Sequence, residues 1–147
     1  MREITFKQLM ISDLQKIKDW RFAVNQMTEE LQTLNAEYTA IKATNYDKMP
    51  SGSGDNYQEE KLLTAIAKRD QKQYELKLTK RRLADLERLL EQLSQEERSV
   101  IYKTIIERGR VDAIANELHC EVRQVYNRRN AALAHLVRLR HGAAYHE

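Results

Sequence analysis

The sequence predicts an all-α fold, in which a long helical hairpin precedes a small three-helix domain. The chain of 147 residues contains only four glycines and one proline, and turns between strands depend on these two residue types. In its first part, apolar residues recur at alternating spacings of three and four, the period of a helix that packs on another helix. Both observations favour helices over strands along most of the chain.

The first helix is expected from about Ser12 to Ala43. We expect Ser12 or Asp13 to cap its start, because both side chains can accept a hydrogen bond from a free backbone amide. Its apolar residues form an unbroken heptad seam: Ile17, Trp20, Val24, Met27, Leu31, Leu34, Tyr38 and Ile41.

A flexible loop is predicted over residues 44–56, which lose this period and hold the proline and two of the four glycines. A second long helix follows, from about Tyr57 to Leu93. Its C-terminal half has an apolar seam at Leu76, Leu83, Leu86, Leu90 and Leu93, whereas Arg69 and Lys72 occupy seam positions in its middle if the register from Leu62 is continued.

Residues 1–93 are therefore predicted to form a helical hairpin of coiled-coil type. A loop of about a dozen residues between two seams permits antiparallel packing of the two helices within one chain. The same seams would also build a homo-oligomer, and the pattern leaves both arrangements open.

Residues 94–147 are predicted to form the three-helix domain. Ser94 and Glu97 have the spacing of a capping box, so a helix should begin at Gln95. Gly109 suits the end of that helix, because glycine reaches positive φ without strain.

A short helix over Val111–Leu118 and a third helix from Val122 are separated by three residues, a spacing typical of a helix-turn-helix. The connecting residues are His119, Cys120 and Glu121. The expected apolar face of the third helix consists of Val122, Val125, Ala132, Leu133, Leu136 and Leu139.

The third helix also carries the predicted DNA-binding residues. Between Val122 and His146 the chain has five arginines and no Asp or Glu, which indicates a polyanionic partner. A recognition helix presents Arg, Gln and Asn to base edges, and the residues opposite the apolar face are Arg123, Gln124, Asn127 and Arg128. We expect Arg110 and Arg129 to contact phosphates, and Tyr126 either to pack on the core or to donate to a phosphate.

Three stretches of this domain resemble region 4 of the bacterial sigma-70 factors: Leu93–Ile101, Ile114–Cys120 and Gln124–Arg128. With its coiled-coil front half, the chain is also similar to phage late-transcription regulators of the RinA and ArpU type. His119 departs from the glycine that region 4 prefers in the turn, and Arg129 stands where region 4 has a buried leucine.

The resemblance implies a sequence-specific DNA-binding transcription regulator, a phage-encoded activator of late genes. Its partners would be double-stranded DNA upstream of a promoter and bacterial RNA polymerase, in the host cytoplasm at the nucleoid. Two alternatives stay open: a DNA-packaging protein similar to terminase small subunits, and an interaction module that docks on RNA polymerase.

The sequence predicts neither an enzyme nor a membrane protein. No catalytic, cofactor-binding or metal-binding constellation is recognised: the Ser-Gly repeat at residues 51–54 lacks the lysine of a phosphate loop, and Cys120 is the only cysteine. With 32% charged residues, the chain has no apolar run near the roughly 18 residues of a membrane span. A lone cysteine fits a reducing cytoplasm.

Overall fold

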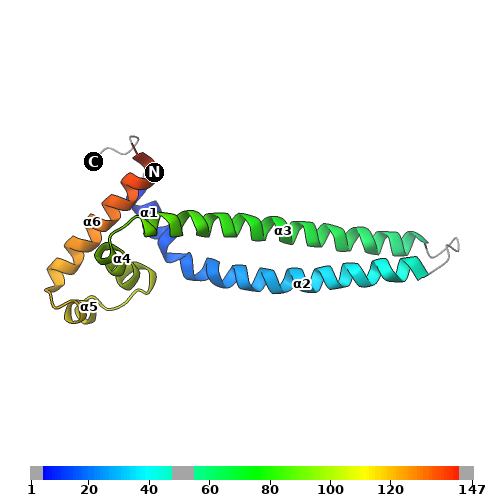
Figure 1. Cartoon of the computed structure of the whole chain (residues 1–147), viewed down its shortest axis with the longest axis horizontal. Helices are drawn as coiled ribbons and strands as arrows, with labels where there is room; N and C mark the ends of the chain where they lie inside the picture. Colours follow the sequence, from blue (N-terminus) through cyan, green and yellow to red (C-terminus); the bar gives the residue numbers. More distant parts are fainter. Residues whose placement is uncertain (1–4, 48–54, 143–147) are drawn as a thin grey trace. The chain divides into compact units, whose positions relative to one another are not determined.

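The computed structural model describes residues 5–47 and 55–142, with side chains over 5–44 and 57–142. No strand occurs in these ranges, so the predicted all-α class is confirmed (Figure 1). The elements are α1 (Phe6–Gln15), α2 (Ile17–Asp47), α3 (Asp55–Glu91), α4 (Gln95–Ile101), the π-helical turn η1 (Tyr102–Ile106), α5 (Val111–Glu117) and α6 (Val122–His141).

The chain divides into two compact units, and their limits differ from the predicted boundary at residues 93 and 94. One unit is Arg21–Arg81, and the other combines Met1–Trp20 with Arg82–Glu147. The difference arises because α1 and the last turns of α3 pack on the C-terminal helices. Leu86, Leu90 and Leu93 lie in the same buried cluster as the core side of α6.

The N-terminal helix begins earlier than predicted. Thr5 and Gln8 form a capping box, in which the Thr5 hydroxyl accepts from the Gln8 amide at 3.2 Å and the Gln8 side chain accepts from the Thr5 amide at 3.0 Å. The chain leaves helical bonding at Lys16, and α2 begins at Ile17. The expected cap at Ser12 or Asp13 is therefore wrong, because both residues lie inside α1.

The discontinuous unit has a well-buried core centred on α6, which packs against α1, α4 and α5. Every helix of this unit except α5 contributes to one cluster of buried residues, and α5 packs in a second, smaller one. The main cluster consists of Met10, Leu14, Ile17, Leu86, Leu90, Leu93, Ile101, Ile105, Ile106, Ala132, Leu133, Leu136 and Val137.

The unit Arg21–Arg81 consists of two antiparallel helical stretches from α2 and α3 (Figure 1). Only Ala65 and Leu76 are buried among its described residues. The predicted seam of α2 is half-buried throughout this unit: Val24, Met27, Leu31, Leu34, Tyr38 and Ile41.

The segment predicted as a flexible loop, 44–56, is partly helical. Helix α2 continues to Asp47 and α3 begins at Asp55. Residues 48–54, on which the prediction mainly rests, lie outside the described residues.

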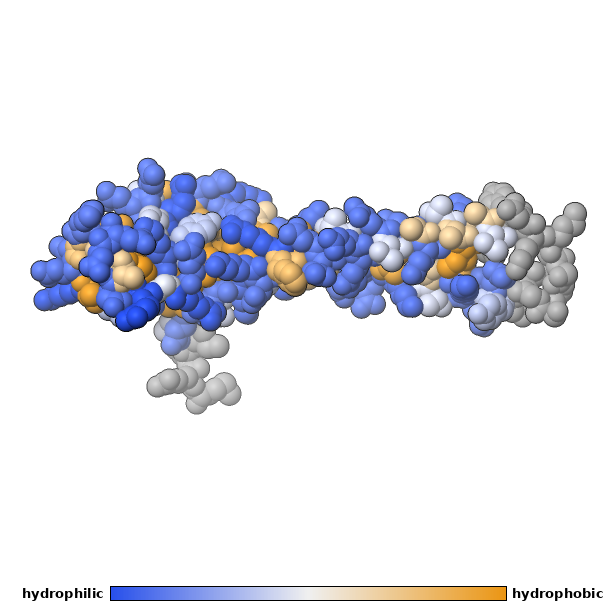
Figure 2. All heavy atoms as spheres, turned by 90° about the horizontal axis from the view of Figure 1, so that it is seen from below, coloured by the Kyte–Doolittle hydropathy of each residue, from blue (hydrophilic) through white to orange (hydrophobic). Residues whose placement is uncertain are grey.

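The outer surface is mainly hydrophilic on the face drawn in Figure 2, with hydrophobic atoms confined to separate patches. Within the described part of the chain, no helix combines the length and the apolar character that crossing a membrane requires.

Candidate nucleic-acid interface

The predicted start of α4 at Gln95 is confirmed. This helix packs against α6 and is followed directly by η1. The Ser94 hydroxyl accepts from the Glu97 amide at 3.2 Å, and the Glu97 carboxylate accepts from the Ser94 amide at 3.1 Å. The inner side of α4 is buried at Val100 and Ile101, and that of η1 at Ile105.

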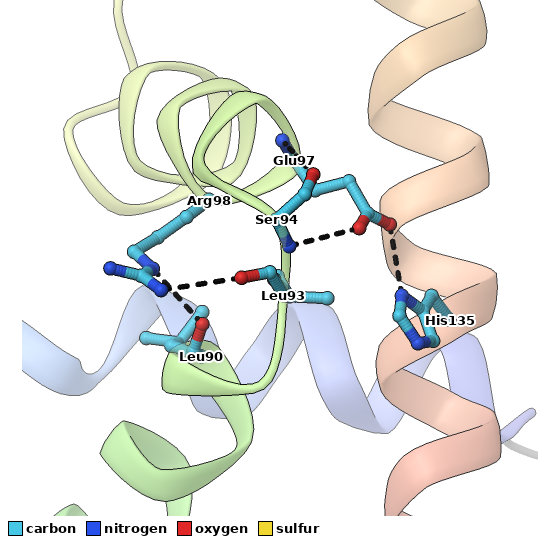
Figure 3. A network of polar contacts seen from close by, with 6 residues as sticks. All are labelled: Leu90, Leu93, Ser94, Glu97, Arg98 and His135. Carbon is cyan, nitrogen blue, oxygen red and sulfur yellow. Dashed lines mark hydrogen bonds and ion pairs between the residues drawn. The ribbon is translucent and has the colours of Figure 1, made fainter.

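The guanidinium of Arg98 closes the end of α3. It donates to the carbonyl oxygens of Leu90 and Leu93 at 3.1 and 3.2 Å (Figure 3) and to that of Glu91 at 3.1 Å. The last carbonyls of a helix lack an amide partner within the helix. The Arg98 side chain donates to the carbonyls of Leu90 and Glu91 at the end of α3 and to that of Leu93 in the connection to α4.

Glu97 also links α4 to α6. Its Oε2 atom lies 3.0 Å from Nδ1 of His135 (Figure 3). Burial raises the pKa of the Glu97 carboxyl, but the hydrogen bonds from Ser94 and His135 outweigh that effect, so its pKa lies below its ordinary value. The ionised carboxylate therefore stabilises the folded state at neutral pH, through both contacts at once.

The end of this helical segment differs from the prediction. Arg108, rather than Gly109, occupies the left-handed region, with φ 53°. The amide of Gly109 donates to the Lys103 carbonyl at 2.9 Å, and a Cβ atom at Gly109 would come within 3.1 Å of that oxygen. Glycine here permits the close backbone approach and is not at positive φ.

Helix α5 and the turn after it are held by a small apolar cluster. Ile114 and Ala115 of α5 pack with Val125 of α6, and the half-buried Cys120 lies against them. His119 has φ 54°, as expected from the glycine that region 4 of the sigma factors prefers there. An ion pair of 2.8 Å between Lys103 and Glu117 also fixes α5 to η1.

The first half of α6 is exposed on most of its circumference. From Val122 to Ala131, only Val125 is buried and only Arg129 is half-buried. Val122 was expected on the apolar face, but it is 42% exposed, because no element covers that side of the first turn. Val137, absent from the expected face, is fully buried.

Four of the predicted DNA-binding residues lie together on the exposed side of α6: Arg123, Gln124, Asn127 and Arg128. Arg123 with Asn127, and Gln124 with Arg128, are pairs four residues apart and therefore neighbours on the helix surface. The Gln124 side-chain oxygen accepts from the Glu121 amide at 3.1 Å, a helix cap that the sequence reasoning overlooked although its Glu-x-x-Gln spacing resembles that of a capping box.

The other three predicted residues lie elsewhere. Tyr126 is exposed and flanks the group, so it does not pack on the core. Arg129 is half-buried, and its Nε atom is buried without a hydrogen-bond partner in the described structure. Arg110 precedes α5 and pairs with Asp112 at 3.1 Å, which neutralises part of its charge.

The exposed half of α6 is an array of hydrogen-bond donors without a competing anion. The whole helix contains no Asp or Glu. Such a surface can donate to phosphates and to base edges. In the described part of the chain, no group of three or more His, Cys, Asp or Glu residues is placed to hold a metal ion.

Comparison with known proteins adds no relative. No family model matches the chain, and neither the curated proteins nor the solved structures include a significant match. The resemblance to sigma-70 region 4 and to the phage regulators therefore rests on the residues of this chain.

Proposed function

We propose that this chain is a sequence-specific DNA-binding transcription regulator, in which α5, the turn and α6 form a helix-turn-helix. One observation carries the proposal. The first half of α6 buries only Val125 and exposes arginine, glutamine and asparagine side chains with no carboxylate among them. These are the side chains that read guanine and adenine in the major groove.

The support of α6 fits a recognition helix. Its second half is anchored by fully buried Leu133, Leu136 and Val137, and Glu97 holds it through His135. A base-reading helix must be fixed in direction, because side chains placed on rigid elements bind with less loss of conformational freedom.

The hydrogen bonds of the exposed residues indicate which of them are free to contact bases. Gln124 uses its side-chain oxygen at the start of α6, so it must give up this bond to contact an adenine with both amide atoms. Arg123, Asn127 and Arg128 are then the principal base readers. We assign Tyr126, Arg110 and Arg129 to phosphate contacts at the edge of the interface, for which Arg110 must release Asp112.

The biological setting follows from the resemblance. A region-4-like domain behind helical coiled-coil segments suits a phage-encoded activator that binds upstream of late promoters and contacts RNA polymerase. The proposal therefore places the DNA site upstream of a late promoter.

The test is selection of binding sites from fragmented genomic and prophage DNA by the purified chain. The double variant Arg123→Ala/Arg128→Ala should lose the selected site, since each bidentate contact contributes about 1–3 kcal/mol of discrimination. Lys80→Ala/Arg81→Ala is the matched control, because it removes two exposed charges from α3 and should keep the preference.

Measurements at two salt concentrations separate base contacts from charge alone. Diffuse binding that disappears with modest salt, and that responds equally to both double variants, would contradict the proposal. A discrete site beside packaging genes instead of a late operon would favour a terminase-like role. Unchanged DNA selection in the Arg123/Arg128 variant would exclude α6 as the reader.

A further inference from the structure

The unit Arg21–Arg81 has an incomplete core. Its described residues bury only Ala65 and Leu76. The facing seam of α3 places Lys72 and Arg69 opposite α2, where Lys72 pairs with Glu30 at 2.8 Å and the Arg69 guanidinium lies 4.4 Å from the centre of the Tyr38 ring. Two helices alone seldom bury a seam completely, and helices of this kind gain stability from further packing.

The uncovered part of the unit forms a groove along one side of the helix pair. It consists of two adjoining hollows of about 460 and 330 Å³ that share Lys68. Apolar side chains line it at Leu34, Ile41 and Ala65. The groove is therefore long and partly apolar, and its open side is accessible to another protein surface.

The α2 wall of the groove is acidic, and the α3 wall is mixed, with one lysine more than glutamate. Helix α2 supplies Glu30 and Glu37, while α3 supplies Lys61, Lys68 and Lys72 together with Glu60 and Glu75. Glu30 is already paired with Lys72. Glu37 and Lys68, across the second hollow, form no ion pair with another described residue.

We propose that this groove is the contact surface for a second copy of the same chain. A twofold axis along the helix pair lays α2 of one copy over α3 of the other, so the acidic α2 wall, with Glu37, meets the α3 wall that carries Lys68. In a twofold interface, every contact occurs twice with the roles exchanged. A surface that carries both Glu37 and Lys68 can therefore pair with an identical surface, and the two helix pairs together form a four-helix bundle.

The antiparallel pairing of α2 and α3 determines which residues of the two helices lie at the same height along the helix axes. Glu30 lies opposite Lys72, and Tyr38 lies opposite Arg69, so Glu37 is nearly level with Lys68. In the twofold arrangement Glu37 of each copy therefore faces the partner's Lys68. The inference is independent of the DNA-binding proposal, because all groove residues lie in Arg21–Arg81 and none on α6.

A charge exchange in the full-length chain tests this pairing. Glu37→Lys places two lysines against each other at both symmetric contacts of a dimer, and Lys68→Glu does the same with two glutamates. Each variant alone should raise the dimer dissociation constant at least tenfold. An equimolar mixture of the two should form a heterodimer with nearly the wild-type constant, because both contacts are again oppositely charged.

The mixture separates contacts between copies from contacts within one chain. Within either variant the residues at 37 and 68 have like charges, so an effect internal to the chain would persist on mixing. Gln32→Lys is the matched control: it adds a positive charge at an exposed residue of α2 outside the groove and should leave dimerisation unchanged.

Sedimentation velocity measures the association, and far-UV circular dichroism checks that each variant stays helical. A wild-type chain that is monomeric up to high micromolar concentration would overturn the proposal, as would single variants that dimerise like the wild type. A mixture that stays monomeric would overturn it too. DNA site selection by α6 is measured separately, so its failure is distinguishable from failure of the dimer.

Discussion

The two units of this molecule use the same helical period with different results. In the unit that contains α6, side chains from α1, α2, α3, η1 and α6 meet from several directions, and residues such as Met10, Leu14 and Leu133 have no exposed surface. In Arg21–Arg81, two stretches of helix meet along one line, and the seam residues of α2 are only half-buried.

The comparison teaches that a heptad seam specifies which side chains face a neighbour, but not how deeply they are buried. Burial depends on how many elements surround the seam. Leu31 and Leu86 both occupy seam positions, yet only Leu86, with α1 and α6 nearby, is buried. The apolar area removed from water sets the stabilisation, so the two units should respond differently to the same substitution.

The largest expected effect is a direct contrast between the cores. Leu133→Ala should lower the free energy of unfolding by about 3–4 kcal/mol, because it opens a cavity in a fully buried site. Leu34→Ala, at a half-buried seam position, should cost roughly 1 kcal/mol. Urea unfolding followed by far-UV circular dichroism measures both losses, because it reports the helices of both units, and fluorescence of Trp20, the only tryptophan, isolates the unit that contains α6. Equal losses would contradict the contrast.

Next in size is the Arg98 cap at the end of α3. Arg98→Ala removes three charged hydrogen bonds to carbonyl oxygens and should cost about 2 kcal/mol, since bonds from a charged group exceed neutral ones. Arg98→Lys keeps the charge but not the planar fork, so most of the loss should remain in urea unfolding. Full recovery with lysine would show that charge alone matters.

A smaller effect depends on pH, through Glu97. The pKa of Glu97 in the folded state lies below its ordinary value of 4.5. Its contribution to the free energy of unfolding is therefore complete above pH 4.5 and is lost as the pH falls through the pKa of the folded state. Glu97→Gln should cost roughly 0.5–1 kcal/mol at pH 7 and flatten the acid dependence. Thermal unfolding between pH 3 and 7 would test this, with His135→Ala as control. An unchanged acid slope would contradict it.

The smallest effect should be a gain. His119→Gly removes the steric cost of φ 54°, offset by the larger freedom of glycine in the unfolded chain, for a net increase of about 0.5 kcal/mol. Gly109→Ala is the contrasting change, because its Cβ meets a backbone oxygen at 3.1 Å, and it should destabilise. The reverse order in thermal unfolding would contradict the assignment of these turns.

Several features of the candidate interface were predictable from local patterns. The capping box at Ser94 and the start of α6 at Val122 depend on contacts within a few residues, so spacing alone predicts them, whereas the left-handed residue in the turn was expected from the resemblance to region 4. The exposed group at Arg123, Asn127 and Arg128 followed from their position opposite Val125.

Other features depend on packing partners distant in the sequence, and those predictions failed. Val122 was assigned to the core and Val137 was not, since neighbours in other helices decide which part of a helix is covered. The contact between Glu97 and His135 joins residues far apart in the chain, and no local sequence pattern predicted it.

The sequence by itself determined the helical class, most helix limits and the carboxylate-free face of α6, because backbone hydrogen bonds, caps and periodicity act over a few residues. Only the tertiary structure decided that α1 and the end of α3 join the C-terminal helices in one core. It also decided that the remaining seam stays half-covered. Burial is a property of all surrounding elements together, so it cannot be read from the period of one helix.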